Sequence, residues 1–304
     1  MNPEYSIVVA TRERPEALEA CLQALAELES PAGGFEVVVV HDGDSDANGA
    51  APNALQLRRL RQTHRGPARA RNAGAEVAKG RYIVFTDDDC LPARDWLLRL
   101  AQRLEDAPGR AVAGRTANGL PENTYAVTSQ LLVDYLNAYY NRDPAHARFA
   151  TANNLALPRS LFEEIGGFDG RFELNAAEDR DLSYRLSRRG SLVFAPDAVI
   201  YHSHRLSLTG FLGQHFRYGR GAFHFHALHR SRPRLEPLRF YRDLARLPLH
   251  SVRPRARATA ALLLLTQLAT AAGYAYELLA RPPRRALPQT ARSRSQRSSR
   301  SFRQ

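Results

Sequence analysis

The 304-residue sequence contains very little cysteine and almost no lysine. Its two cysteines, Cys21 and Cys90, are too few for a disulfide framework or a zinc site, so we expect a reducing compartment. Lysine occurs once, at Lys79, so arginine carries nearly all of the positive charge. No signal peptide is visible before the first apolar run, which starts at Tyr5. These absences predict a cytoplasmic protein.

Acidic residues are missing from the end of the chain. Residues 281–304 contain eight arginines and no acid, which is two thirds of the net charge of +12. Together with its serine, proline and glutamine content, this predicts a disordered Arg/Ser-rich tail. Such a tail can contact an anionic membrane surface or nucleic acid, and a solvated extension without a partner is an equal alternative. We expect no specific nucleic-acid recognition.

Apolar runs and helical patterns alternate along the first part of the chain. Runs at 5–11, 35–40 and 81–85 are typical of buried strands, and 57–62 is a weaker strand. Helical patterns with short connections separate them. This alternation predicts an α/β fold built on a Rossmann-like, doubly wound and mostly parallel sheet.

The second half is less regular, and an uncharged stretch at 258–276 follows it. That stretch is close to the lower length limit of a membrane span, about 17 residues, but Gln267 and several threonines and alanines dilute its apolarity. We expect a packed or interfacial helix, and a span is the alternative. Strands are expected at 111–116, 149–157, 192–194 and 198–202, and helices from Ala93 and at 125–140 and 177–188.

Three consecutive aspartates, Asp87, Asp88 and Asp89, follow the apolar run at 81–85. They lie where open α/β sheets bind ligands, at the carboxyl end of a strand. Neighbouring carboxylates repel one another, and hard cations such as Mg2+ or Mn2+ prefer oxygen ligands. We therefore expect a divalent cation here, and an acidic cap of the helix from Ala93 is the alternative.

Six motifs between residues 5 and 220 together resemble glycosyltransferase family 2. They lie at 6–11, 39–43, 66–74, 87–89, 166–169 and 178–179. Each is weak alone, but their order and spacing match the family. The resemblance implies a GT-A fold and an inverting, metal-dependent enzyme. Such an enzyme transfers a sugar from a nucleoside-diphosphate sugar to a hydroxyl of a glycan, lipid or other small acceptor.

The resemblance also divides the chain into regions. Residues 1–225 would form the glycosyltransferase domain, with 1–117 binding the nucleotide sugar and 118–225 holding acceptor and catalytic groups. Residues 226–280 would be a helical extension able to contact a membrane, and 281–304 the disordered tail. The enzyme would then work in the cytoplasm or peripherally on the cytoplasmic face of the membrane.

Four positions outside the aspartates would bind the donor by this resemblance. Asp42 would hydrogen-bond the base or ribose, and an Asx turn is its alternative role. Arg71 would face the base or the diphosphate, a suitable task for a guanidinium group. Ala10 and Thr11, which end the first motif, would also contact the nucleotide sugar.

Among the aspartates, the resemblance implies that Asp87 and Asp89 bind ribose and metal, while Asp88 shares either task. His202 would complete the metal shell, and His204 is the alternative. The nucleobase is not predicted, because the chain departs from the family pattern beside Asp42. His41 stands where an acid is common, and Asp44 replaces a small hydroxyl residue.

The acidic pair at 178–179 would supply the catalytic base. The family places the base at the position of Asp179, which would accept the proton of the acceptor hydroxyl as it attacks the anomeric carbon. An aspartate with an ordinary pKa of about 3.9 is ionised at neutral pH and ready for this task. Capping of a helix is the alternative, because acids are common in a first helical turn.

Four further residues would bind the acceptor or the leaving diphosphate: Asn154, Glu178, Gln214 and Arg217. Gln214 and Arg217 belong to a Q-x-x-R-Y sequence similar to a motif of processive family members. Asn154 would face the crevice from a strand, and a satisfied buried amide is the alternative.

Two other classes of protein remain as alternatives. A nucleotidyltransferase of related fold should carry a loop with glycine and lysine after the first strand, but residues 11–15 contain neither. A non-catalytic basic adaptor would bind a membrane or nucleic acid through the tail. That function leaves the aspartates and Asp179 unexplained.

Overall fold

The computed structural model describes residues 2–43, 50–172, 176–231, 236–252 and 255–280. The expectations for Asp44 and for the tail at 281–304 lie outside these residues.

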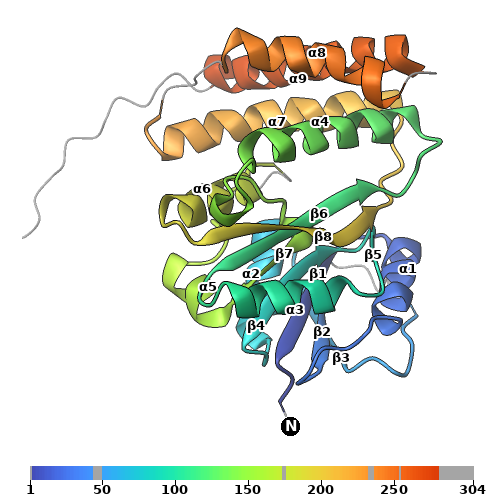
Figure 1. Cartoon of the computed structure of the whole chain (residues 1–304), viewed down its shortest axis with the longest axis vertical. Helices are drawn as coiled ribbons and strands as arrows, with labels where there is room; N and C mark the ends of the chain where they lie inside the picture. Colours follow the sequence, from blue (N-terminus) through green and yellow to red (C-terminus); the bar gives the residue numbers. More distant parts are fainter. Residues whose placement is uncertain (1, 44–49, 173–175, 232–235, 253–254, 281–304) are drawn as a thin grey trace, which may run out of the picture.

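The described residues form one sheet with the strand order β3-β2-β1-β4-β7-β6-β8-β5 (Figure 1). Strands β3, β2, β1 and β4 are parallel neighbours, and so are β6 and β8. Strands β7 and β5 pair antiparallel with their neighbours. This confirms the predicted α/β, mostly parallel sheet. The strands are β1 (Tyr5–Thr11), β2 (Phe35–Asp42), β3 (Leu57–Gln62), β4 (Tyr82–Asp87), β5 (Cys90–Pro92), β6 (Ala111–Asn118), β7 (Leu155–Pro158) and β8 (Leu192–His202).

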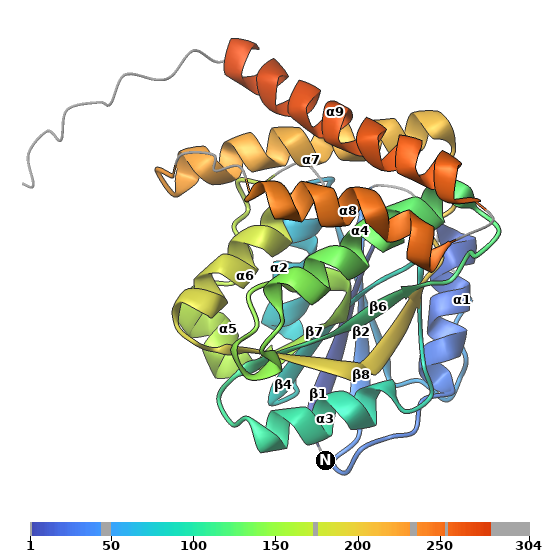
Figure 2. The same cartoon turned by 45° about the horizontal axis from the view of Figure 1, so that its top comes forward.

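Helices cover both faces of this sheet. One hydrophobic core contains buried residues of α1 and α3, and the other contains residues of α2, α5 and α6. Helices α4 and α7 lie above the sheet, and α8 and α9 form an outer layer beyond them (Figures 1 and 2). The helices are α1 (Pro15–Ala26), α2 (Pro67–Val77), α3 (Trp96–Asp106), α4 (Thr124–Tyr140), α5 (Arg159–Ile165), α6 (Glu178–Arg188), α7 (Leu208–Leu228), α8 (Leu238–Ser251) and α9 (Ala256–Ala280).

The motif at 66–74 shows why the sequence folds this way locally. Pro67 occupies the start of α2, where its missing N–H costs no hydrogen bond. A Cβ atom on Gly74 would lie 2.4 Å from Cγ1 of Val8 in β1. The helix therefore approaches the sheet more closely than any residue with a side chain would allow, and this fixes the start of α2 beside the strand ends.

Three predicted boundaries were wrong. The strand expected at 149–157 begins only at Leu155, because a short 3-10 turn (Ala152–Asn154) precedes it. The strands expected at 192–194 and 198–202 are one strand, β8, whose pairing with β6 is irregular. The helix expected from Ala93 starts at Trp96, because residues 90–92 first pair with β8.

Candidate active site

A cavity of about 420 Å³ lies at the carboxyl ends of β1 and β4. The chain continues from β1 to its neighbour β2 on one side and from β4 to strands on the other side, and open α/β sheets bind ligands where the strand order reverses in this way. Ala10 and Thr11 at the end of β1 both line the cavity. The opposite wall comes from α4 and α7. A volume of this size suits a small-molecule ligand.

The three aspartates at the end of β4 point in different directions. Asp87 and Asp89 line the cavity. Asp88 is fully buried, accepts a 2.6 Å hydrogen bond from Thr11 Oγ1 and lies 2.8 Å from Nη2 of Arg14. Burial raises the pKa of Asp88 to about 7, against the opposing effect of Arg14. The structure thus corrects the expectation for Asp88, which is shut off from the cavity and supports the end of β1 instead.

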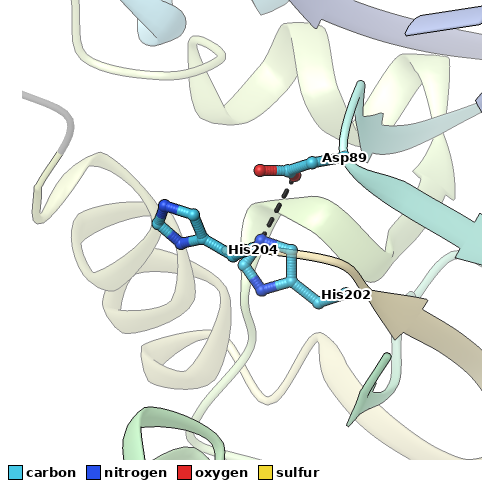
Figure 3. A group of neighbouring side chains, drawn as sticks. All are labelled: Asp89, His202 and His204. Carbon is cyan, nitrogen blue, oxygen red and sulfur yellow. Dashed lines mark ion pairs between the residues drawn. The ribbon is translucent and has the colours of Figure 1, made fainter. Parts of the chain in front are cut away.

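Asp89, His202 and His204 form a group that could hold a metal ion (Figure 3). One ligand atom from each residue lies within 4.8 Å of the others, and Asp89 Oδ1 is 3.2 Å from His202 Nε2. The sheet brings them together, because Cys90 of β5 pairs with His202 of β8. One carboxylate and two imidazoles fit a divalent cation and suit Mn2+ better than Mg2+.

The charges in this group are coupled. Burial alone would raise the pKa of Asp89, but the adjacent His202 brings it below its usual range. Burial opposes the charged form of His202, yet the Asp89 carboxylate raises the pKa of this imidazole. Burial lowers the pKa of His204. A cation binds the neutral imidazole and the ionised carboxylate, so binding at His202 would release the proton that Asp89 favours there.

Arg71 links the two halves of the site. Its guanidinium lies 2.6 Å from Asp87 Oδ1 and 3.0 Å from Glu178 Oε1, and it packs over the ring of Phe168. Burial raises the pKa of Glu178 to about 7, while Arg71 opposes that shift. Arg71 lines the cavity and pairs with two carboxylates, and its expected contact with base or diphosphate stays a prediction. Asp87 is likewise paired with Arg71 and lies outside the metal group.

This network predicts a measurable loss of stability in an Arg71→Lys variant. Lysine keeps the charge but cannot bridge two carboxylates with a planar fork, so we expect the free energy of unfolding to fall by about 2 kcal/mol. Urea denaturation measures it. The matched control is Arg69→Lys, an exposed arginine on the same helix, which should change stability by less than about 0.5 kcal/mol. Equal losses in both variants would contradict a role for the bridge.

Asp179 lies in the first turn of α6 and lines the same cavity as Asp89. Its Oδ1 accepts a 2.7 Å hydrogen bond from the N–H of Arg180. Burial raises the pKa of Asp179 above its ordinary value. The preceding Ala177 has φ of 76°, a left-handed conformation that is strained for alanine and typical of functional sites. The fold therefore holds this carboxylate at the cavity despite a cost.

Both carboxylate oxygens of Asp42 accept hydrogen bonds from the end of β3 and from the loop that precedes α2. Its two oxygens accept hydrogen bonds from the side chains of Gln62 and His64 and from the N–H groups of Arg65 and Gly66, all 2.8–2.9 Å long. A carboxylate has about four acceptor positions, so Asp42 shapes this loop as a turn residue would. Its side chain lines the cavity, and so does that of His64, whose other ring nitrogen lies 2.9 Å from Nη1 of Arg12.

Helix α7 contributes Gln214, Arg217 and Tyr218 to the cavity. Gln214 donates a 3.0 Å hydrogen bond to the hydroxyl of Tyr218. Among the described residues, the other polar atom of this amide, Gln214 Oε1, and the carboxylate atom Glu178 Oε2 are both buried without a hydrogen-bond partner. Buried acceptors are normally satisfied, so these two atoms fit a ligand that carries hydroxyl groups.

Asn154 does not face the cavity. It is fully buried and bonds the indole N–H of Trp96 at 2.9 Å and the carbonyl oxygens of Arg115 and Ala198 at 3.0 Å. The alternative expectation of a satisfied core amide therefore describes it, and the expected acceptor contact is corrected. Its neighbour Asn153 lines the cavity instead.

Sequence reasoning missed the part played by Arg14, which bridges two of the aspartates. Its Nη1 lies 2.6 Å from Asp89 Oδ2, and its Nη2 contacts Asp88. A signal was present, because Arg12 and Arg14 follow directly on β1 and thus lie at the same sheet edge as the aspartates.

Comparison with known proteins gives related enzymes. The model of "Glycosyl transferase family 2" matches residues 6–166, more than half of the chain. Glycosyltransferase AglE of Haloferax volcanii is 25% identical over 227 residues, which cover 72% of this chain and 73% of that protein. Validoxylamine A glucosyltransferase of Streptomyces hygroscopicus subsp. jinggangensis is 26% identical over 220 residues, 62% of this chain. The chain spans only about half of that second relative, 52% of its length.

A solved structure is similar over most of the fold. Mannosyltransferase PcManGT from Pyrobaculum calidifontis, in complex with GDP-Man and Mn2+, is 25% identical and superposes with a TM-score of 0.57. The match covers 92% of this chain and 79% of that one. The similarity confirms the predicted GT-A fold class.

Proposed function

The chain belongs to glycosyl transferase family 2, and from this membership we propose an inverting, cation-dependent transfer of a sugar from a nucleoside-diphosphate sugar to an acceptor hydroxyl. One observation carries the proposal: the Asp89–His202–His204 group and Asp179 line the same cavity at the switch point of the sheet. A site for the donor's diphosphate and a separate carboxylate would therefore share one cavity.

At the donor end, Asp89, His202 and His204 would hold the cation. When bound, it would neutralise the diphosphate and the charge that builds on the leaving group. The complex of PcManGT with GDP-Man and Mn2+ supports this assignment. Arg217 lines the cavity and would meet the leaving diphosphate. Asp42 would act by holding His64 toward the nucleotide.

The sugar would lie between α6 and α7. The unpartnered atoms Glu178 Oε2 and Gln214 Oε1 would each accept a hydrogen bond from a sugar hydroxyl. Arg71 holds Glu178 against the aspartate run and so keeps the first turn of α6 in place. Asp179 would take the proton of the acceptor hydroxyl as its oxygen attacks the anomeric carbon opposite the diphosphate. A single displacement of this kind inverts that centre.

The proposal includes the acceptor and the location. A hydroxyl of a glycan or a lipid suits the acceptor position, because Asp179 can take the proton of either. Residues 1–225 would form the transferase domain, and 226–280 would form a helical extension. Cys21 and Cys90 are both free and buried, in keeping with a cytoplasmic enzyme.

A test of products distinguishes this function from that of a nucleotidyltransferase. Incubated with Mn2+ and a panel of nucleotide sugars, the protein should release a nucleoside diphosphate, measured by coupled assay or chromatography. Chelation of the cation should stop the release. Release of pyrophosphate would contradict the proposal. The matching donor should also stabilise the protein, by about 2.7 kcal/mol at a hundred times its dissociation constant.

A further inference from the structure

Helix α9 buries several polar residues and exposes an apolar side. Thr259, Thr266 and Glu277 are buried against the protein, together with Leu263 and Gly273. Leu264, Leu268 and Leu279 are 62%, 57% and 83% exposed. The helix lies in the outermost layer, over α7 (Figures 1 and 2). A helix that covers a soluble domain normally turns its apolar residues inward and its polar residues toward water. The exposed leucines of α9 are therefore unusual for a surface that faces water.

The orientation of α9 is fixed by its contact with α7. A Cβ on Gly219 would lie 1.9 Å from the carbonyl oxygen of Thr270, and one on Gly273 would lie 2.0 Å from that of Phe216, so the two backbones touch. Glu277 Oε1 lies 2.6 Å from Nε of Arg220 on α7. Rotating the leucines inward would break this buried ion pair.

The same contacts argue against a membrane span. Helix α9 is long and apolar enough to cross a bilayer by length and composition. To do so it would have to leave α7 and carry Glu277 into hydrocarbon, where an unpaired carboxylate is costly. An orientation along a surface keeps the ion pair and the exposed leucines satisfied together.

Positive charge surrounds the apolar side. Arg239, Arg242 and Arg246 are exposed on the adjoining α8, where Asp243 pairs with Arg242, and Arg255 and Arg257 are exposed near the start of α9. The sequence after α9 adds eight arginines and no acid at 281–304. Arginine therefore borders both ends of the apolar helix.

The arginines indicate which partner can cover the apolar side of α9. A second copy of the chain, packed parallel or antiparallel along α9, would bring arginine against arginine. The tail at 281–304 contains eight arginines and five serines, too polar a segment to cover leucines. An anionic lipid surface complements both the apolar side and the arginines.

We propose that the outward side of α9, with the neighbouring arginines of α8, docks on an anionic bilayer and lies in its interfacial region. We call this side the lipid face: Leu264, Leu265, Leu268, Tyr276, Leu278 and Leu279. The docking stands independently of the transferase activity. If that proposed function also holds, an acceptor carried by a lipid is favoured, because α7 lies between the lipid face and the cavity.

The test uses the full chain and vesicles of phosphatidylcholine with or without phosphatidylglycerol. Wild-type protein should sediment with the anionic vesicles and only weakly with the neutral ones. The double variant Leu264→Glu/Leu268→Glu should bind about 100-fold more weakly, since each buried leucine contributes about tenfold. Leu279→Glu alone should lose about tenfold. These side chains are exposed, so melting temperatures should not change.

The matched control is Gln23→Glu/Gln102→Glu on α1 and α3, exposed positions that receive the same change of charge away from the lipid face. Its binding should fall by no more than about threefold. Failure of wild type to bind anionic vesicles would overturn the proposal. So would unchanged binding by both leucine variants, or a dimer in light scattering that the double variant converts to monomer without any vesicle binding. Release of nucleoside diphosphate without vesicles should be equal in all variants, so a failed transferase proposal would be recognised separately.

Discussion

Replacing Asp179 with asparagine should lower kcat by about 10³-fold while donor affinity stays within about twofold. The amide has nearly the same size and keeps the hydrogen bond from Arg180, but it cannot accept a proton. Turnover is measured as nucleoside diphosphate released with acceptor present, and donor affinity by calorimetry with Mn2+. This split between catalysis and binding is expected only if the carboxylate acts on the acceptor.

The pH profile gives a second measure of the same role. Burial raises the pKa of Asp179. A general base works only when deprotonated, so kcat/KM should fall as the pH drops through this raised pKa, above the ordinary value of about 3.9. The acid limb should disappear in the asparagine variant. Asp106→Asn, the same change at the exposed end of α3, should keep both rate and profile. A wild-type rate in Asp179→Asn would remove the residue from the reaction.

The sequence predicted what local patterns encode. Apolar runs and helical periodicity predicted the parallel half of the sheet, because strands buried on both faces are apolar throughout. The aspartates follow one of these apolar runs, so the sequence also placed them correctly at a strand end. The acid at 179 could be placed only through the resemblance to a family, since a first helical turn often carries acids.

The remaining errors concern long-range contacts. Asp88 turns away from the cavity because Thr11 and Arg14, some 75 residues earlier, bind it. Asn154 enters the core because the indole of Trp96 needs an acceptor there. Single-sequence patterns contain the identity of such residues but not their partners, so neither direction could be predicted.

The members of the metal group also depend on long-range contacts. The resemblance to the family implied Asp87 and Asp89 together, but the direction of each carboxylate depends on a guanidinium from another element. Arg71 draws Asp87 toward α6, and the pairing of β5 with β8 places His202 beside Asp89. Both histidines, rather than one, then belong to the candidate group.

Asp89 belongs to the metal group and Asp87 pairs with Arg71, so substitutions of these two aspartates should have different effects. Asp89→Asn should weaken Mn2+ binding by at least about 100-fold, because it removes the single carboxylate of the described metal group. Donor binding in the presence of Mn2+ should be lost with it. Titration calorimetry and the electron paramagnetic resonance signal of free Mn2+ measure both effects. His202→Ala should weaken the cation in the same direction.

Asp87→Asn is the matched control, the same chemical change two residues earlier. It should keep Mn2+ affinity within about threefold, although it gives up the ion pair with Arg71 and should lower the free energy of unfolding by about 2 kcal/mol. The two variants are thus expected to show opposite losses, one of cation affinity and one of stability. Loss of Mn2+ binding in Asp87→Asn, with binding retained in Asp89→Asn, would show that Arg71 releases Asp87 to the cation. The metal site would then be organised around Asp87 and not around the two histidines.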